Sequence, residues 1–163
     1  MKHSSLIILL VFTTLSSIGQ TQIKSNSIYI ELGGNALFTS INYERKLFNN
    51  LNFTAHFGTG VYGIKPTYLT IPFGVKYLFN LKGSTDFVDI GFGATYSRAD
   101  VKLYKMVDRK NPNFKQTNFW NFIPNLGYKK VTKNNLMYRI SLTPVFNHND
   151  MIPFIGLSFG KCF

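Results

Sequence analysis

Apolar and polar residues alternate with a period of two along almost the whole chain after Ser27. In segment 69–79, for example, the odd-numbered positions read Leu, Ile, Phe, Val, Tyr and Phe. Successive side chains of a β-strand point to opposite faces, whereas an amphipathic helix repeats at i, i+3 and i+4. The helical spacing does not persist beyond a few residues. The pattern therefore predicts an all-β protein.

Eight alternating segments can be counted, and polar turn sequences separate them. The segments are 28–32, 41–43, 51–61, 69–79, 88–96, 120–128, 136–146 and 155–163. Short turns are expected at 49–50, 81–86 and 132–135, and the opposite connections at Thr39–Ser40, 63–67, 98–117 and 147–150. At 163 residues the chain suits one domain. We expect an eight-stranded antiparallel up-and-down β-barrel.

The composition of the two faces indicates which one points outward. The positions that alternate with the apolar ones, called here the second parity, are rich in Gly, Ser, Thr and Asn. Charged residues make up only 15% of the chain, against roughly 25% in soluble domains. A secreted, lipocalin-like barrel that binds an apolar ligand inside would instead carry many Lys and Glu outside. We therefore expect the apolar parity to face lipid, as in a transmembrane barrel, with the soluble carrier as an alternative.

Charged residues of both signs lie on the parity assigned to the lumen. They are predicted to form an ion-pair network of Glu31, Glu44, Lys46, Lys76, Asp89, Lys129 and Arg139. A structural network is one interpretation, because a buried charge must be paired; a proton or ion pathway is the other. The structural one is preferred, since an eight-stranded barrel is just wide enough for side chains to fill it.

The aromatic residues of the apolar parity fall into two bands. Tyr43, Tyr77, Tyr128 and Tyr138 are expected at one rim, and Phe38, Tyr96, Trp120 and Phe146 at the other. Arg45 and Lys161, the charges found on this parity, lie at strand ends, where long side chains can reach water. Such bands are typical of membrane interfaces.

Three prolines conflict with the predicted strands. Pro72, Pro124 and Pro144 lie inside them, although a closed barrel has no edge where a missing N–H is harmless. Bulges or shifted strand ends are expected to absorb them.

The N-terminus has the features of a cleaved signal peptide. Lys2 precedes a short apolar run from Leu6 to Leu15 and small residues near Gly19. A transmembrane anchor is the alternative, but the run falls short of the roughly 20 residues that a spanning helix needs. We predict a signal peptide at 1–19 and a barrel domain at 20–163.

The long connection 98–117 is the best candidate for binding. It carries Arg98, Lys102, Tyr104, Lys105, Arg109, Lys110 and Lys115. A basic, aromatic loop at the cell surface could contact lipopolysaccharide phosphates or an acidic partner. A solvated loop, or an extension of the flanking strands, explains the same composition. Export argues against nucleic acid as the partner, despite the net charge of +11.

The last strand, IGLSFGKCF, resembles the C-terminal strand of outer-membrane β-barrel proteins. In that family an aromatic last residue and alternate apolar positions, here Phe163 and Phe159, are read by the barrel-assembly machinery; Lys161 departs from the pattern. The stretch YIELGGNALFTSINYERKL is similar to the start of small bacteroidete-type barrels related to OmpX and OmpA. The resemblance implies export to the outer membrane, with its lipid and lipopolysaccharide as partners; no specific protein partner is indicated.

Residues for chemistry are sparse in the predicted mature chain. It has one cysteine, Cys162, and two histidines, His56 and His148, without the spacing of a helical metal site. The stretch at His148 lacks the serine of the lipid A hydrolases among such barrels, and Gly33-Gly34-Asn35 is read as part of a strand. We expect no cofactor and no enzymatic activity. Three functions remain, in order of preference: a structural or interaction barrel, a small-solute transport barrel, and a lipocalin-like carrier.

Overall fold

The molecule is a single antiparallel sheet that closes on itself. The structure is a computed structural model, and it describes residues 24–48, 50–62, 67–82, 85–97, 119–146 and 151–163. Its elements are β1 (Asn26–Gly33), η2 (Gly34–Ala36), β2 (Thr39–Lys46), β3 (Phe53–Tyr62), β4 (Tyr68–Lys82), β5 (Asp86–Ser97), β6 (Phe119–Val131), β7 (Leu136–Leu142), β8 (Val145–Phe146), β9 (Met151–Ile152) and β10 (Ile155–Cys162).

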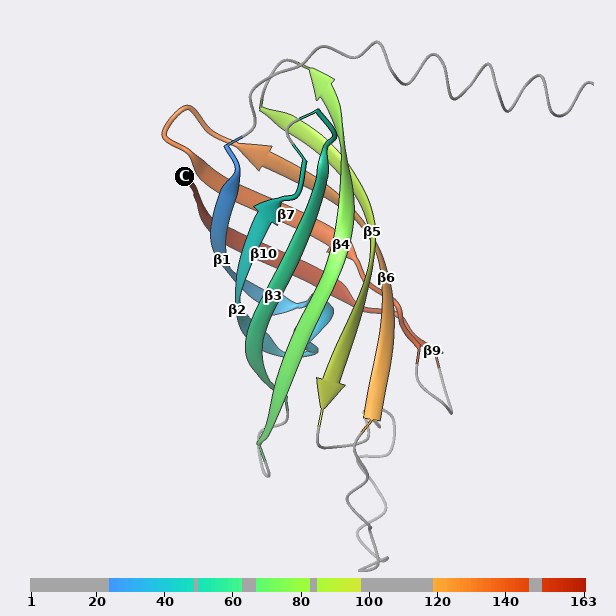
Figure 1. Ribbon diagram of the computed structural model, residues 1–163. Helices are drawn as coiled ribbons and strands as arrows, with labels where there is room; N and C mark the ends of the chain where they lie inside the picture. Colours follow the sequence, from blue (N-terminus) through green and yellow to red (C-terminus); the bar gives the residue numbers. More distant parts are fainter. Residues whose placement is uncertain (1–23, 49, 63–66, 83–84, 98–118, 147–150) are drawn as a thin grey trace, which may run out of the picture.

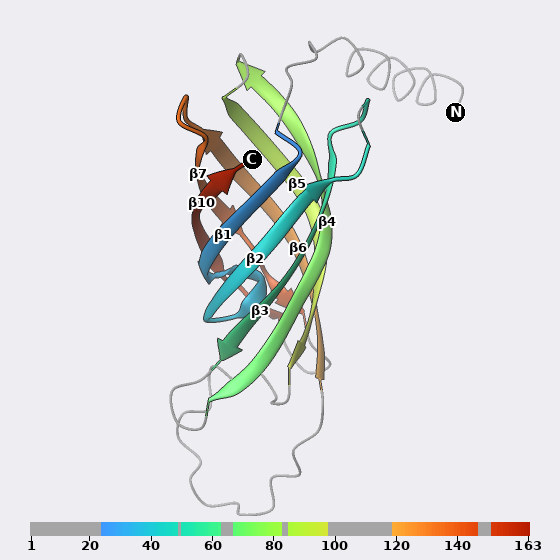
Figure 2. The same ribbon diagram turned by 60° about the vertical axis from the view of Figure 1, so that its left-hand side comes forward.

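Pairing between the first and last strands closes the barrel. β1 pairs with β2 on one side and with β10 on the other, and β5 pairs with β6. The backbone groups of Asn26 and Phe163 extend the closure with two hydrogen bonds, of 3.0 and 2.8 Å. β8 and β9 are two-residue continuations of β7 and β10 in the same registers, so the ten labelled strands make eight. Figures 1 and 2 show the strands winding around one interior. The predicted eight-stranded antiparallel barrel is confirmed.

The two rims of the barrel differ. The turn end holds the start of β1, the end of β10 and the turns that join β2 to β3, β4 to β5 and β6 to β7 (Figure 1). The loop end holds η2 and the strand ends that border 63–67, 98–118 and 147–150. Within the described ranges, no helix is long and apolar enough to cross a membrane.

The prolines leave gaps in the hydrogen-bond ladders, and the register does not shift there. The β6–β7 and β6–β8 pairs have one common register, which places Pro124 opposite Pro144. The β7–β10 and β8–β9 pairs also share one register, which places Pro144 opposite Pro153. Pro72 lies in a similar gap between β3 and β4. The expected bulges are therefore wrong at Pro72, Pro124 and Pro144, whereas an interrupted strand does occur at Pro144, which lies between β7 and β8. The missing N–H groups of Pro124, Pro144 and Pro153 coincide in one row across the sheet.

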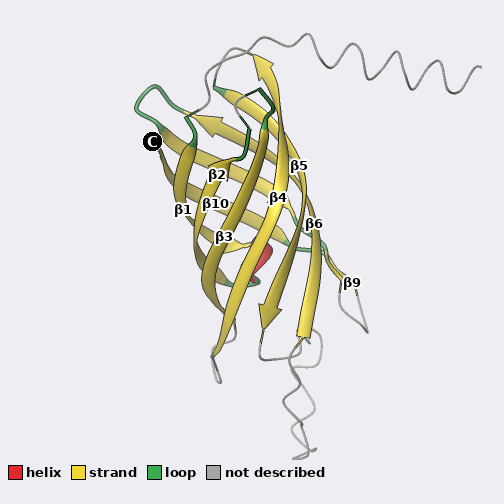
Figure 3. Ribbon diagram, in the orientation of Figure 1, coloured by secondary structure: helices red, strands yellow, loops and turns green. Residues whose placement is uncertain are grey.

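The first loop-end connection differs from the prediction. Thr39 and Ser40 belong to β2, and the chain turns instead at η2, so the sequence Gly33-Gly34-Asn35 is not part of a continuous strand. Gly33 and Gly34 have φ values of 70° and 66°, a region that glycine enters without steric cost. The turn folds into the barrel mouth rather than outward (Figure 3), and Asn35, Ala36 and Leu37 are buried there.

The apolar parity faces outward, as predicted. Ile30, Leu32, Phe57, Ile90 and Phe92 each expose about half or more of their area. The same pattern holds on the later strands at Trp120, Phe122, Leu126, Ile140, Leu157 and Phe159. Their sequence neighbours on the second parity are buried in the lumen, so each strand has one apolar outer face and one largely polar inner face.

Candidate functional site

The lumen contains a cluster centred on Glu44, whose carboxylate lies between two lysines. Lys76 Nζ donates to one oxygen at 2.7 Å, and Lys129 Nζ donates to the other at 2.6 Å. Lys76 also donates to the hydroxyl of Tyr29 at 3.3 Å and lies 5.3 Å from the centre of its ring. We call Tyr29, Glu44, Lys76 and Lys129 the Glu44 cluster.

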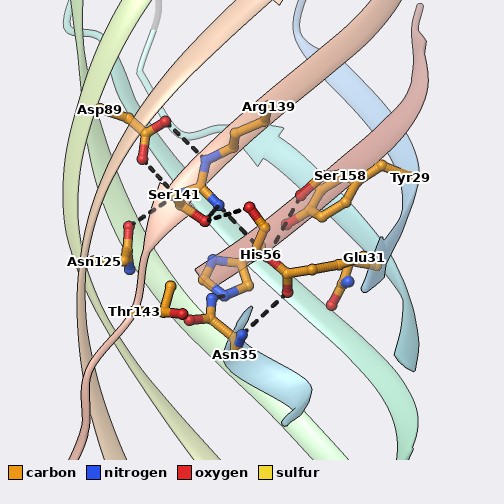
Figure 4. A network of polar contacts seen from close by, with 12 residues as sticks. Tyr29, Glu31, Asn35, His56, Asp89, Asn125, Arg139, Ser141, Thr143 and Ser158 are labelled. Carbon is orange, nitrogen blue, oxygen red and sulfur yellow. Dashed lines mark hydrogen bonds and ion pairs between the residues drawn. The ribbon is translucent and has the colours of Figure 1, made fainter. Parts of the chain in front are cut away.

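A second cluster surrounds Arg139 (Figure 4). Its guanidinium binds Asp89 in a bidentate arrangement, with Nε at 2.8 Å and Nη2 at 2.6 Å from the two oxygens. Nη1 donates to Ser141 at 3.1 Å and lies 3.5 Å from Glu31. Nη2 also donates to Asn125 at 3.1 Å. The Arg139 cluster thus satisfies the planar donor set of arginine within the interior.

Glycine makes room for this second cluster. A Cβ atom at Gly127 would lie 2.7 Å from Asp89 Oδ2 and 2.9 Å from Arg139 Nε. A side chain at this lumen position would therefore displace the bidentate pair. This explains physically why small residues accompany the charged ones on the inner face.

The two clusters balance their charge. They contain the three carboxylates Glu31, Glu44 and Asp89 and the three cations Lys76, Lys129 and Arg139, and each of these side chains is at most 4% exposed. An unpaired charge at such depth would cost several kcal/mol, whereas a paired and hydrogen-bonded set can be accommodated. The structure brings six of the seven predicted network residues together.

Lys46, the seventh predicted residue, has a different position. It follows the inward parity but lies at the turn end of β2, where its side chain is only half-buried. The structure therefore places Lys46 at the mouth of the lumen, because it is the last residue of β2, and its part in the ion-pair network stays a prediction.

Next to the Arg139 cluster, the inward turn fills the loop end of the lumen. Asn35 donates its backbone N–H to Glu31 at 3.3 Å, and its side-chain nitrogen lies 2.9 Å from His56 Nε2. Thr95 donates to the backbone carbonyl of Asn35, and Thr70 to that of Ala36 at 3.3 Å. The turn is thus tied to β1, β3, β4 and β5, and it acts as an internal plug.

Apolar side chains lie in the lumen beyond the polar clusters. The sequence analysis did not predict these apolar clusters. Leu37, Ile123 and Val145 form a cluster at the loop end. At the turn end, Tyr29 packs with Met137 and Cys162. The signal in the sequence was the isolated apolar residues on the polar parity, such as Ile123 and Met137. In the part of the chain that the structure describes, apolar side chains thus lie at both ends of the lumen, with the polar clusters between them.

The other predicted site residues fall into two groups. Phe159 and Phe163, predicted to signal assembly, lie on β10 and just after it, with more than half of their area exposed. The candidate binding loop 98–117, His148 and the predicted signal peptide 1–19 lie outside the described residues. Among the residues that the structure describes, no group of His, Cys, Asp or Glu could hold a metal ion.

Comparisons with known proteins identify the fold. No family model matches the sequence, and no curated protein matches it significantly. The Yersinia pestis outer membrane protein Ail, solved in a phospholipid bilayer nanodisc, has a TM-score of 0.52 at 11% identity, covering 86% of this chain and 99% of that chain. The N-terminal β-barrel domain of Pseudomonas aeruginosa OprF has a TM-score of 0.58 at 13% identity, covering 88% of this chain and 98% of that chain.

These two likenesses agree with the closed antiparallel pairing of the strands. At 11% and 13% identity they establish the fold and carry no conclusion about individual side chains. The chain has the fold of the small eight-stranded outer-membrane β-barrels of the OmpA and OmpX type.

Proposed function

We propose that this protein is an integral outer-membrane barrel with a side-chain-filled lumen, and that its role is structural or one of surface interaction. The single observation that carries the proposal is the inverted distribution of polarity. Large apolar side chains are exposed around the wall, while six charged side chains are buried inside. A soluble barrel distributes them the other way round, because burying apolar surface and hydrating charge both stabilise a fold in water.

The aromatic bands support a membrane setting. Tyr43, Tyr128 and Tyr138 are exposed near the turn end, and Trp120 and Phe146 near the loop end. Aromatic side chains favour the two interfaces of a bilayer, where one part of the ring is apolar and the other polar. The separation into two bands gives the wall an apolar zone between them, as a spanning barrel requires.

The filled lumen favours an anchor over a channel. The Glu44 cluster, the Arg139 cluster and the inward turn follow one another from the turn end to the loop end, and apolar layers lie beyond them. A diffusing solute would have to break several buried ion pairs. The network is therefore assigned a structural role, and a small-solute transport barrel is the less favoured function.

The surface-interaction part of the proposal rests on the sequence of loop 98–117. Its basic residues, which include Arg98, Arg109 and Lys110, would meet lipopolysaccharide phosphates or an acidic protein at the loop end. Phe159 and Phe163 are proposed to be read by the barrel-assembly machinery during insertion. The proposal assigns no reaction and no cofactor to the chain.

Envelope fractionation and gel mobility test the membrane proposal. The chain is expressed with its own first residues, and the membrane fraction is run on a gel with and without boiling. We expect it in the outer membrane with a heat-dependent mobility shift, because a closed barrel resists detergent until it is heated. A periplasmic protein that needs no detergent would refute the proposal and favour a ligand carrier.

Two further measurements separate the remaining roles. In planar bilayers the filled barrel should give no discrete current steps, and regular steps would favour transport.

Replacing Arg109 and Lys110 by Gln should weaken binding of purified lipopolysaccharide to the reconstituted barrel. Unchanged binding would remove the loop from the proposal without affecting the membrane location.

A further inference from the structure

A groove crosses the outer wall of the barrel over β6, β7, β10 and β1, from the turn end at Lys130 on β6 toward the loop half of β1 at Leu32. Its volume is about 530 Å³, within the roughly 300–1,000 Å³ of ligand pockets. Two rows of outward side chains line it, as the strand registers show. One row is Lys130, Tyr138, Phe159 and Ile30; the other is Tyr128, Ile140, Leu157 and Leu32.

The backbone of two adjacent strands forms the floor of this groove. Arg139 and Ser158 pair across β7 and β10, and both also line the groove. Their side chains point into the lumen and are buried, so only their backbone can face outward. The groove therefore reaches the sheet itself, between side chains that stand higher on either side.

Fixed contacts hold the walls of the groove. The rings of Tyr138 and Phe159 pack with their centres 5.2 Å apart. The Tyr128 hydroxyl donates to Asp86 at the turn end of β5. Because these side chains are held by neighbours, the shape of the groove is present before any ligand arrives, which lowers the cost of binding.

Cationic side chains mark the end of the groove that is nearer to water. The side chain of Lys130 is 55% exposed, and its Nζ lies 3.9 Å from Asp86, a loose contact that leaves donors available. Lys161 also points outward on β10, one outward position beyond Phe159 toward the turn end. The groove thus combines an apolar trough with two amines beside its outer edge.

We infer that this groove binds an anionic phospholipid of the membrane leaflet at the turn end, with one acyl chain in the trough and the phosphate near Lys130 and Lys161. The inference rests on the proposed membrane location. Four strands span three spacings of about 4.8 Å, so the trough accommodates an acyl segment of about 14 Å. Apolar contact alone gives little preference inside a bilayer, because the bulk lipid is equally apolar. Charge complementarity therefore decides which lipid occupies the groove.

Quenching by brominated lipids tests this inference. The chain has one tryptophan, Trp120, so the substitutions Trp120→Phe and Tyr138→Trp give a single reporter in the groove wall. The barrel is inserted into phosphatidylcholine vesicles that contain either brominated phosphatidylglycerol or the same fraction of brominated phosphatidylcholine. A second reporter, Tyr77→Trp, lies outside the groove on β4 and measures the average lipid.

We expect the Y138W reporter to be quenched more strongly by the brominated phosphatidylglycerol, and the Y77W reporter to show a smaller difference. K130Q and K161Q should each reduce the enrichment by about fivefold, the effect of one basic residue near an anionic surface. K133Q, at an exposed lysine of the β6–β7 turn, is the matched control and should leave the enrichment unchanged.

Equal quenching by both lipids in a barrel that retains its heat-dependent mobility would overturn the groove inference and leave the membrane proposal intact. A preference that survives the K130Q/K161Q double substitution would overturn it as well. Quenching by neither lipid would show that the barrel does not enter the bilayer, and would refute both.

Discussion

Removing the charge of Asp89 should destabilise the barrel strongly. Asp89→Asn keeps the size of the side chain but replaces a carboxylate that binds Arg139 through two hydrogen bonds, of 2.6 and 2.8 Å. Arg139 would remain buried, and Glu31, whose oxygen lies 3.5 Å from Arg139 Nη1, would be the remaining carboxylate of the Arg139 cluster. The variant therefore leaves a buried cation with an incomplete partner set.

The structure sets the expected size of this effect. Breaking a buried pair by removing one partner costs about 3–5 kcal/mol. Asp89→Asn should lie near the lower bound, because Glu31, Asn125 and Ser141 still contact the guanidinium. Replacing both partners, as in D89L/R139M, should cost less than the two single substitutions together, because neither charge of the Asp89–Arg139 pair is left alone, although Glu31 loses its contact with Arg139. The coupling energy from the cycle of D89L, R139M and D89L/R139M should be up to about 3 kcal/mol.

Urea unfolding in phospholipid vesicles measures these changes, with Trp120 fluorescence followed in both the folding and the unfolding direction. With a slope of about 1–3 kcal/mol per molar urea, D89N should lower the midpoint by at least about 1 M. K130Q, which removes an exposed and loosely paired lysine, serves as the control and should leave the midpoint nearly unchanged. If D89N had the same urea midpoint as K130Q, or if the losses in unfolding free energy of the two single variants simply added in the double variant, water would be screening these charges. Either result would refute the claim that side chains fill the lumen.

Two other substitutions test the same account with the urea assay. Glu44→Gln should destabilise more than D89N, because it leaves both Lys76 and Lys129 buried without their shared carboxylate; a smaller loss would contradict the pairing. Gly33→Ala should cost about 1–3 kcal/mol or more, since φ is +70° and the new Cβ would lie 2.3 Å from a backbone oxygen. Gly93→Ala is the milder comparison, with its nearest atom at 3.1 Å, and equal effects would contradict the role of the turn at Gly33.

The strands and their two faces could be predicted because a strand repeats every two residues. Glu31, Asp89 and Arg139 were assigned to one lumen from parity alone, since a closed sheet brings all inward positions together. Parity does not give the height of a residue along the barrel. For that reason the sequence predicted one shared network, whereas the registers separate the Glu44 cluster from the Arg139 cluster.

The remaining features depend on contacts between distant segments. Alternation cannot show that Gly33 ends a strand and that Asn35 turns inward to reach His56, because that turn is stabilised from several strands. The proline gaps were missed for a similar reason. Pro124, Pro144 and Pro153 are far apart in sequence, and only the register shows that they form one row. A single row of gaps preserves the pairing on both sides, so no bulge is required.

The orientation of the two faces is the central claim, and a nitroxide scan of residues 155–160 on β10 tests it most directly. In a Cys162→Ser background, each position is labelled in turn in vesicles, and its access to oxygen and to a water-soluble nickel complex is measured. We predict high oxygen access at Leu157 and Phe159 and low access to both reagents at Gly156 and Ser158. If labels at Leu157 and Phe159 were strongly accessible to the nickel complex and inaccessible to oxygen, the claim that the apolar face meets lipid would be contradicted.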